Sequence, residues 1–269
     1  MPIDVEAEVL WNRRLSPDYH VLALAAPSIA ERVEPGQFVM VKTADGQDPL
    51  LRRPFSVFEI LRGDAGMPTG FTILSKRVGP GTARLYAAPP GRTLACLGPL
   101  GRPFTLVDPP VEAWMVAGGV GLAPFATLAE RLRERGCAVT LFYGARQAHE
   151  LFAVDLFEKM GVRTVLATED GTCGVHGRIS EPLAVDLGRR ASDAPLMVYA
   201  CGPEPMLVAV SRLAAAHGRP SQLAMERVMG CGMGGCFSCV VRVRAGDGTK
   251  YVRSCIEGPV FAGEDIVWE

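Results

Sequence analysis

The stretch that decides how this chain is organised reads Cys231-Gly-Met-Gly-Gly-Cys236-Phe-Ser-Cys239, followed at a distance by Cys255. Three cysteines in a C-x4-C-x2-C run with a remote fourth have the ligand spacing of plant-type [2Fe-2S] clusters. A rigid two-iron core needs four thiolates in one small volume, and the glycines let the backbone wrap closely around it. The spacing predicts a [2Fe-2S] cluster held by Cys231, Cys236, Cys239 and Cys255.

Two other interpretations of these cysteines stay open. Four cysteines also suffice for a structural zinc site, and free cysteines often serve as small buried residues. Zinc loops usually pair their ligands as two short C-x2-C knuckles joined by a longer spacer, which fits a three-plus-one arrangement poorly. Because a cluster carries electrons, we expect the rest of the chain to supply an electron donor and a recipient.

The composition is that of a globular protein with no nucleic-acid or membrane partner. The 269 residues carry 28 Lys and Arg against 29 Asp and Glu, with no dense basic run. The longest uncharged run, residues 113–129, is broken by glycines and a proline, and the N-terminal residues lack a basic signal region. The four other cysteines are scattered singly, as expected of reduced thiols in a cytoplasmic protein.

The first hundred residues read as short strands separated by glycine and proline. Residues 5–10 and 19–24 alternate in polarity, while residues 37–42 and 70–75 each follow a turn cluster. Several strands at this spacing predict a small antiparallel barrel. Asp108-Pro109-Pro110 is then expected to link the barrel to the next domain.

Two stretches within the expected barrel have phosphate-binding chemistry. Arg53-Pro54-Phe55-Ser56 places a guanidinium and a hydroxyl at a strand junction, although an exposed arginine there is commonplace. Further on, Gly81 frees a backbone amide, and Thr82 supplies a hydroxyl and a cap for a helix reaching Tyr86. Each stretch alone has a simpler interpretation; together they predict a bound diphosphate.

From residue 113 the pattern changes to strands that alternate with helices. Apolar strands at residues 113–117, 139–143, 162–166 and 196–200 predict a parallel sheet whose ligands bind at the strand C-terminal ends. The turn Gly118-Gly119-Val-Gly121-Leu-Ala-Pro124 suits a phosphate, although Pro124 replaces the third glycine of the dinucleotide fingerprint and no acid ends the second strand. A second turn, Cys201-Gly202-Pro203, favours nucleotide binding over a tight connection.

In this order the motifs resemble the ferredoxin reductase superfamily, in which an FAD-binding barrel precedes a pyridine-nucleotide domain. The ending from Glu226 through the cysteines to Phe261 is similar to one branch, the electron transfer subunits of dihydroorotate dehydrogenase B. The resemblance covers nearly the whole chain. It implies an FAD-binding antiparallel β-barrel over residues 1–108, an NAD(H)-binding parallel α/β domain over 109–222, and a small [2Fe-2S] subdomain over 223–269.

The resemblance also implies where each cofactor binds. Flavin contacts are expected from Arg53, Pro54, Phe55, Ser56, Leu74, Ser75, Lys76, Gly81 and Thr82. Nucleotide contacts are expected from Gly118, Gly119, Gly121, Pro124, Cys201, Gly202 and Pro203. No side chain is expected to act as a catalytic acid or base, because hydride passes directly between nicotinamide and flavin. Cys201 is expected near the nicotinamide, with a small buried strand-end residue an equally good interpretation.

The implied function is electron transfer in pyrimidine (UMP) biosynthesis. Electrons would pass from FMN in a catalytic subunit that oxidises dihydroorotate to orotate, through the cluster and FAD, to NAD+. The family suggests a heterotetramer of two catalytic and two electron transfer subunits. An alternative keeps the cofactors but serves a hydrogenase, sulfhydrogenase or ferredoxin:NADP oxidoreductase complex. A non-catalytic scaffold with a zinc knuckle is a third possibility.

Two further loops carry weaker signals for the nucleotide. His149-Glu150 is either a ribose contact or, more simply, a solvated helix start. The loop of Thr168-Glu-Asp-Gly171 follows the third strand, where ligands tend to bind, and a plain surface loop explains it equally well. The family favours NADH, whereas Arg146 would suit a 2′-phosphate.

Overall fold

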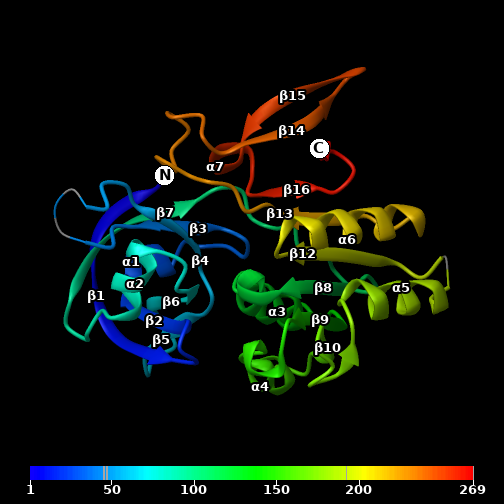
Figure 1. Cartoon of the computed structure of the whole chain (residues 1–269), viewed down its shortest axis with the longest axis horizontal. Coiled ribbons are helices and arrows are strands. Elements are labelled where there is room, and N and C mark those ends of the chain that lie inside the picture. Colours follow the sequence, from blue (N-terminus) through cyan, green and yellow to red (C-terminus); the bar gives the residue numbers. More distant parts are fainter. Residues whose placement is uncertain (45, 47, 192, 269) are drawn as a thin grey trace.

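The computed structural model describes residues 1–44, 46, 48–191 and 193–268. Over these residues the chain folds into two large sheets and a small hairpin (Figure 1), and the hairpin projects away from the other two. No helix in this part of the chain is long and apolar enough to cross a bilayer.

The N-terminal sheet is antiparallel and curls into the expected barrel, in the order β4-β3-β7-β1-β2-β6-β5. Alternate residues such as Leu22, Leu24 and Ile73 fill its interior, because successive side chains of a strand point to opposite faces. Two short helices, α1 and α2, accompany these strands, and α2 is the helix predicted to reach Tyr86. The bounds are β1 (Ile3–Arg14), β2 (Tyr19–Ala25), α1 (Pro27–Ala30), β3 (Phe38–Val41), β4 (Arg53–Ser56), β5 (Ile60–Arg62), β6 (Pro68–Lys76), α2 (Pro80–Tyr86) and β7 (Thr93–Leu100).

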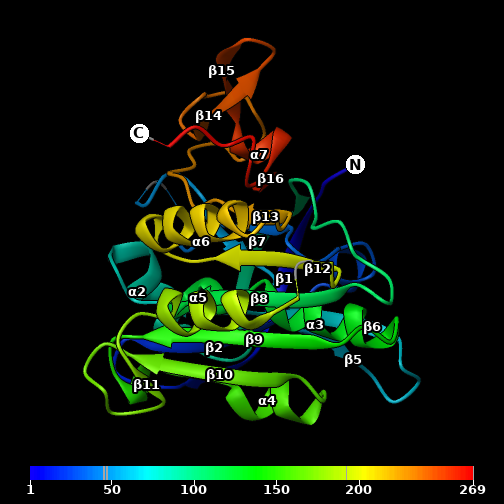
Figure 2. The ribbon, with the colours of Figure 1, turned by 90° about the vertical axis from the view of Figure 1, so that its right-hand side faces the viewer.

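The second sheet confirms the predicted nucleotide-domain architecture, in the order β11-β10-β9-β8-β12-β13-β16 with only β16 antiparallel to its neighbour. Its central strands are buried on both sides, so they read as continuous apolar runs. Helices α3 and α4 cover one face and α5 and α6 the other (Figure 2). The bounds are β8 (Glu112–Gly118), η1 (Gly119–Leu122), α3 (Phe125–Glu134), β9 (Val139–Ala145), η2 (Ala148–Glu150), α4 (Val154–Lys159), β10 (Arg163–Thr168), β11 (Val175–His176), α5 (Ser180–Arg189), β12 (Leu196–Cys201), α6 (Glu204–Ala216), β13 (Ser221–Ala224) and β16 (Val260–Ala262).

The cysteine segment is a loop out of this second sheet. The chain leaves at β13, forms the hairpin of β14 (Val240–Ala245) and β15 (Gly248–Arg253) and the short helix α7 (Ser254–Glu257), and returns as β16 beside β13. The expected division between residues 222 and 223 therefore falls inside β13, and β16 belongs to the nucleotide sheet. The domain limits at 108 and 222 stay predictions.

The barrel and the second sheet share an apolar interface at the connection between them. Phe104 is 3% exposed and packs against Phe125 at 6.0 Å and Tyr199 at 5.4 Å between ring centroids. The Tyr199 hydroxyl donates a hydrogen bond of 2.9 Å to the carbonyl of Thr105. Val21, Phe58 and Leu74 of the barrel belong to the same apolar cluster. The two sheets are thus joined by a common core.

Truncating this contact should destabilise the whole chain. We expect Phe104→Ala to lower the free energy of unfolding by about 3–5 kcal/mol, the usual cost of removing a buried phenylalanine. Urea titration followed by tryptophan fluorescence measures it. Val78→Ala, at a position 76% exposed, is the control and should change stability by less than about 0.5 kcal/mol. A Phe104 variant as stable as this control would contradict a shared core.

Candidate functional site

A cleft of about 430 Å³ opens at the C-terminal ends of the central parallel strands. In the sheet, β9 lies on one side of β8 and β12 lies on the other. The chain therefore leaves β8 toward β9 and leaves β12 toward β13, so the loops after β8 and β12 run in opposite directions. Such a switch point is where open α/β sheets bind ligands. Five of the glycine-turn residues expected to contact nucleotide line the cleft: Gly118, Gly119, Gly121, Gly202 and Pro203.

The glycines of the two turns have different tasks. A Cβ on Gly121 would lie 2.2 Å from the carbonyl oxygen of Cys201, so only glycine lets the two turns touch. Gly119 has φ +54° and open space around it, so it supplies a left-handed turn. Pro124 is buried as the N-cap of α3 and does not line the cleft.

Cys201 lies at the end of β12 with its thiol packed against the core. Burial, with a smaller contribution from Glu226, raises the pKa of this thiol to about 12, so it is neutral at physiological pH. Cys201 is not among the cleft-lining residues. Its expected place beside the nicotinamide stays a prediction.

One edge of the cleft is charged. Arg146 follows β9, Glu169 follows β10, and Arg178 precedes α5, and all three line the cleft. The loop after β10 therefore faces the cleft, whereas His149 does not line it. Arg178 was missed from the sequence because no motif marks it, and Glu226 was noted only as the start of the cysteine-rich ending. Both residues line the cleft because of the order of the strands.

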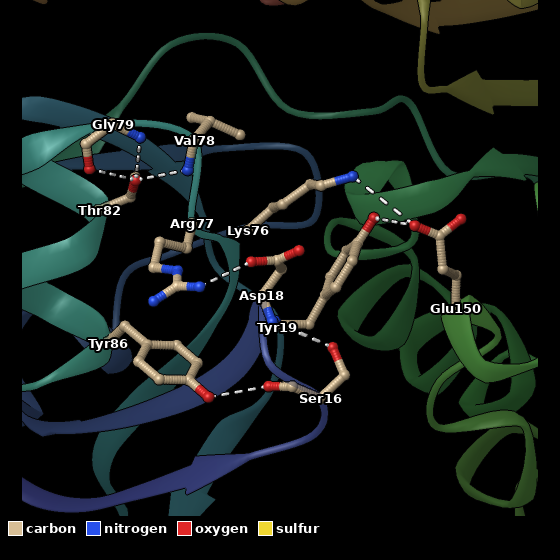
Figure 3. Close-up of polar contacts among 10 residues, drawn as sticks. All are labelled: Ser16, Asp18, Tyr19, Lys76, Arg77, Val78, Gly79, Thr82, Tyr86 and Glu150. Atoms are coloured by element: carbon tan, nitrogen blue, oxygen red, sulfur yellow. Dashed lines mark hydrogen bonds and ion pairs between the residues drawn. The ribbon is translucent and has the colours of Figure 1, made fainter.

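Glu150 connects this edge to the barrel (Figure 3). Its carboxylate accepts a hydrogen bond of 3.3 Å from the Tyr19 hydroxyl and lies 3.7 Å from Lys76 Nζ. The same carboxylate accepts a 3.3 Å bond from the amide of Arg146. Glu150 is thus a partly buried anchor, with its side chain 16% exposed, rather than a solvated helix start.

The expected flavin residues come from neighbouring parts of the barrel. Arg53 to Ser56 form β4, Leu74 to Lys76 end β6, and Gly81 and Thr82 open α2. The Thr82 hydroxyl accepts hydrogen bonds from the amides of Val78 at 2.8 Å and Gly79 at 3.1 Å. Thr82 therefore stabilises the start of α2 from the third helical position, whereas the N-cap itself is Gly79 rather than the expected Thr82.

These elements leave polar groups without partners where a diphosphate is expected. A Cβ on Gly81 would lie 3.3 Å from Thr43 Oγ1 and 3.6 Å from Arg53 Cγ, so these three residues converge. Among the described residues, the hydroxyls of Thr43 and Ser75 are buried and lack a hydrogen-bond partner. A guanidinium beside unpartnered hydroxyls and a glycine turn fits an anionic cofactor.

The four cysteines of the opening motif come together as two pairs. Cys231 and Cys236 interact with each other, as do Cys239 and Cys255, and Cys231 also lies close enough to Cys255 to interact with it. Backbone amides point at the first pair: Gly235 donates to Cys231 Sγ at 3.2 Å, and the Cys231 amide donates to Cys236 Sγ at 3.4 Å. A hydrogen bond from Ser238 leads the effects that lower the pKa of Cys236 to about 6.

Four cysteines brought together in this way can supply the ligands of a two-iron core. The four thiolates of a two-iron core are shared between its irons, and two pairs of cysteines can supply them. Amides aimed at the sulfurs also favour the thiolate form that ligates metal.

The cysteine loop packs on the barrel strand next to the flavin motif. Cys239 and Cys255 share an apolar cluster with Met40, Leu97 and Leu100 of the barrel. A Cβ on Gly232 would lie 2.5 Å from Met40 Cγ, and Met40 pairs with Pro54 in the β3–β4 register. Only strand β3 therefore separates the cysteine loop from β4.

The two glycines of the cleft give a matched pair of variants. We expect Gly121→Ala to weaken NADH binding at least about tenfold, or 1.4 kcal/mol, because its Cβ would push the two turns apart. The Cβ of Gly119→Ala would have no atom within 4 Å. This variant should therefore lose only about 1–2 kcal/mol of folding free energy, the cost of a left-handed backbone conformation for alanine. Calorimetric NADH titration and thermal melting separate the effects. Equal NADH affinity in Gly121→Ala and the wild type would contradict the proposed cleft.

Comparison with known proteins agrees with this layout. Residues 226–267 match the iron-sulfur cluster binding domain of dihydroorotate dehydrogenase B, and residues 115–212 match the oxidoreductase NAD-binding domain. The structure resembles an NADH-dependent reduced ferredoxin-NADP oxidoreductase, with a TM-score of 0.83 and 27% identity over 98% of this chain and 90% of that one. It shares its fold with a Neisseria gonorrhoeae ferredoxin NADP+ reductase, with a TM-score of 0.67 and 22% identity over 80% of this chain and 92% of that one.

Similarity to curated relatives extends over almost the full length. The dihydroorotate dehydrogenase B (NAD(+)) electron transfer subunit of Desulforamulus reducens is 36% identical over 265 residues, 98% of each chain. The subunit of the same name from Geobacillus thermodenitrificans is 37% identical over 261 residues, 96% of each chain. This chain belongs to the family of dihydroorotate dehydrogenase B electron transfer subunits.

Proposed function

We propose that this chain carries electrons between NAD+ and a catalytic subunit that oxidises dihydroorotate to orotate, by way of FAD and a [2Fe-2S] cluster, in pyrimidine (UMP) biosynthesis. One observation carries the proposal: the cysteine loop packs on β3 beside the flavin strand β4, while Tyr19 and Lys76 of the same barrel line the nucleotide cleft. The three proposed cofactor sites would thus lie around one barrel. The relatives' names favour NAD+ as the nucleotide.

The residues that would hold the cofactors follow from the site. Arg53 and the Gly81 turn would bind the FAD diphosphate, and the glycine turns after β8 and β12 would bind the nucleotide. Bound FAD would exchange hydride with the nicotinamide and single electrons with the cluster. The protein's task is to hold these groups in contact and keep water away.

The cysteine pairs give the cluster an inner and an outer edge. Cys239 and Cys255 are 2% and 1% exposed and lie against the barrel, whereas Cys236 is exposed at the surface. The inner pair would face the flavin and the outer pair a partner. Electrons would then enter the cluster on one side and leave on the other without a conformational change.

Exposed apolar residues close in sequence to the outer pair mark the proposed docking site of the catalytic subunit. Val228, Met233 and Phe237 lie within three residues of Cys231 or Cys236 in the chain and are 82%, 59% and 61% exposed. The Arg253 guanidinium stacks 4.8 Å from the Phe237 ring centroid, which fixes that ring. Apolar side chains gathered beside a redox centre are typical of a protein interface. We propose that two such chains join two FMN-containing catalytic subunits in the cytoplasm.

A charge within this surface should weaken the complex selectively. We expect Val228→Glu to reduce affinity for the catalytic subunit on the order of tenfold or more, because a carboxylate would be desolvated on binding. Reduction of FAD by NADH should stay at the wild-type rate. Val185→Glu, at a surface valine of α5 that is 49% exposed, is the control for an added charge. Biolayer interferometry measures affinity, and equal binding by both variants would contradict the docking site.

Loss of one cluster ligand should stop electron transfer between the catalytic subunit and FAD. We expect Cys236→Ser to abolish dihydroorotate-dependent NAD+ reduction in the reconstituted complex, because a thiolate ligand is lost. Flavin reduction by NADH should persist in the folded variant. Cys173→Ser, a single thiol in the loop after β10, should leave both reactions intact. Coupled turnover at the wild-type rate in Cys236→Ser would disprove the proposed order of carriers.

A second candidate function keeps the cofactors and changes the partner. The similarity to the NADH-dependent ferredoxin-NADP oxidoreductase spans 98% of this chain, so the same layout serves other electron acceptors. The two functions can be distinguished by reconstituting the protein either with a dihydroorotate-oxidising subunit or with ferredoxin. The partner that sustains NAD+ reduction identifies the function.

A further inference from the structure

We propose that Glu150 is a positioning residue for hydride transfer: one carboxylate holds the edge of the nucleotide cleft at a fixed place against the flavin-binding strand. The inference rests on the proposed function, because it concerns the approach of nicotinamide to FAD. Figure 3 shows the residues on the barrel side of this contact.

The backbone around Glu150 is anchored within the second sheet. Its carbonyl accepts a hydrogen bond of 3.1 Å from the hydroxyl of buried Tyr143, and its amide donates a 3.0 Å bond to the carbonyl of Gln147. One turn earlier, the amide of Ala148 donates to Thr172 Oγ1 at 2.9 Å. The Glu150 side chain therefore projects toward the barrel from a fixed base.

On the barrel side, both donors contact the same oxygen. Glu150 Oε1 accepts from the Tyr19 hydroxyl at 3.3 Å and lies 3.7 Å from Lys76 Nζ. Tyr19 and Lys76 are direct partners in the β2–β6 register, and Nζ lies 4.8 Å from the Tyr19 ring centroid. The Tyr19 ring also packs on Phe152 at 4.7 Å. A hydrogen bond with Tyr19 leads the effects that raise the pKa of Lys76, so its ammonium stays charged.

On the nucleotide side, the other oxygen holds the end of β9. Glu150 Oε2 accepts from the amide of Arg146, the residue that follows the strand and lines the cleft. In a doubly wound sheet, the end of the strand next to the phosphate-binding strand meets the ribose. The two oxygens thus connect the ribose edge of the cleft to the last residue of the flavin strand β6.

This contact differs from a second ion pair that joins the barrel to the nucleotide domain. Arg62 of β5 and Glu130 of α3 approach to 3.6 Å, with side chains 40% and 36% exposed, and neither lines the nucleotide cleft. Glu130→Gln removes an ion pair between the same two units without touching the cleft. It is therefore a matched control for Glu150 variants.

The test uses rapid mixing of the FAD-loaded protein with NADH. We expect Glu150→Ala to lower the limiting rate of flavin reduction by on the order of ten- to a hundredfold, the range that a displacement of about 1 Å costs. The NADH dissociation constant should change far less. The long-wavelength charge-transfer absorbance between nicotinamide and flavin should weaken, because it reports stacking of the rings. Tyr19→Phe, which removes one hydroxyl, should show the same pattern more weakly, and Glu130→Gln should match the wild type.

A second measurement needs no cofactor turnover. Amide hydrogen exchange of residues 146–152 in the protein without nucleotide should speed up in Glu150→Ala, because the Arg146 amide loses its acceptor, and stay unchanged in Glu130→Gln.

Each outcome has one meaning. Wild-type limiting rate and charge-transfer band in Glu150→Ala would overturn the inference, and so would an equal loss in Glu130→Gln. If Glu150→Ala does not fold, a wild-type limiting rate in Tyr19→Phe would likewise overturn the inference. A wild-type protein that NADH does not reduce would instead refute the proposed function.

Discussion

The packing of the cysteine loop against strand β3 is the contact on which the rest of the molecule depends. Gly232 leaves no room for a side chain beside Met40, and Met40 is the cross-strand partner of Pro54 in the flavin motif. The cysteine segment is also attached to the nucleotide sheet, through β13 and β16 and through Val241 and Val243 of β14, which pack in the core of that domain. Through the contact with Met40 the cysteine loop lies against β3, the strand that is hydrogen-bonded to the expected flavin strand β4, so main-chain hydrogen bonds help to set the spacing of the cluster and flavin sites.

The second sheet completes the path by approaching the same barrel from another side. Its strand order opens a cleft where the loops after β8 and β12 diverge, and the apolar junction around Phe104 brings that cleft to the ends of β2 and β6. Glu150 then joins the two across the cleft mouth. The proposed nucleotide, flavin and cluster sites are therefore arranged around one barrel, which suits a relay whose carriers must stay in close contact.

Much of this layout can be predicted from the sequence, because local patterns record it directly. The C-x4-C-x2-C run, the two glycine turns and the alternation of strand and helix report the cysteine pairs, the cleft and the parallel sheet. Contacts between distant segments leave no such local record. Neither Tyr19 nor Arg178 belongs to a motif, and the sequence around Glu150 indicates a solvated helix start or a ribose contact, because its partners Tyr19 and Lys76 lie far away in the chain. The return of β16 to the nucleotide sheet likewise depends on pairing across the cluster loop, which no short pattern reveals.

The most direct test of a three-carrier relay is an anaerobic NADH titration of the purified protein, followed by visible absorbance and low-temperature electron paramagnetic resonance. We predict that the flavin and iron-sulfur bands bleach together and that the signal of a reduced [2Fe-2S] cluster grows as they do. A colourless protein that contains zinc, or a flavin that bleaches while the cluster stays oxidised, would contradict the relay.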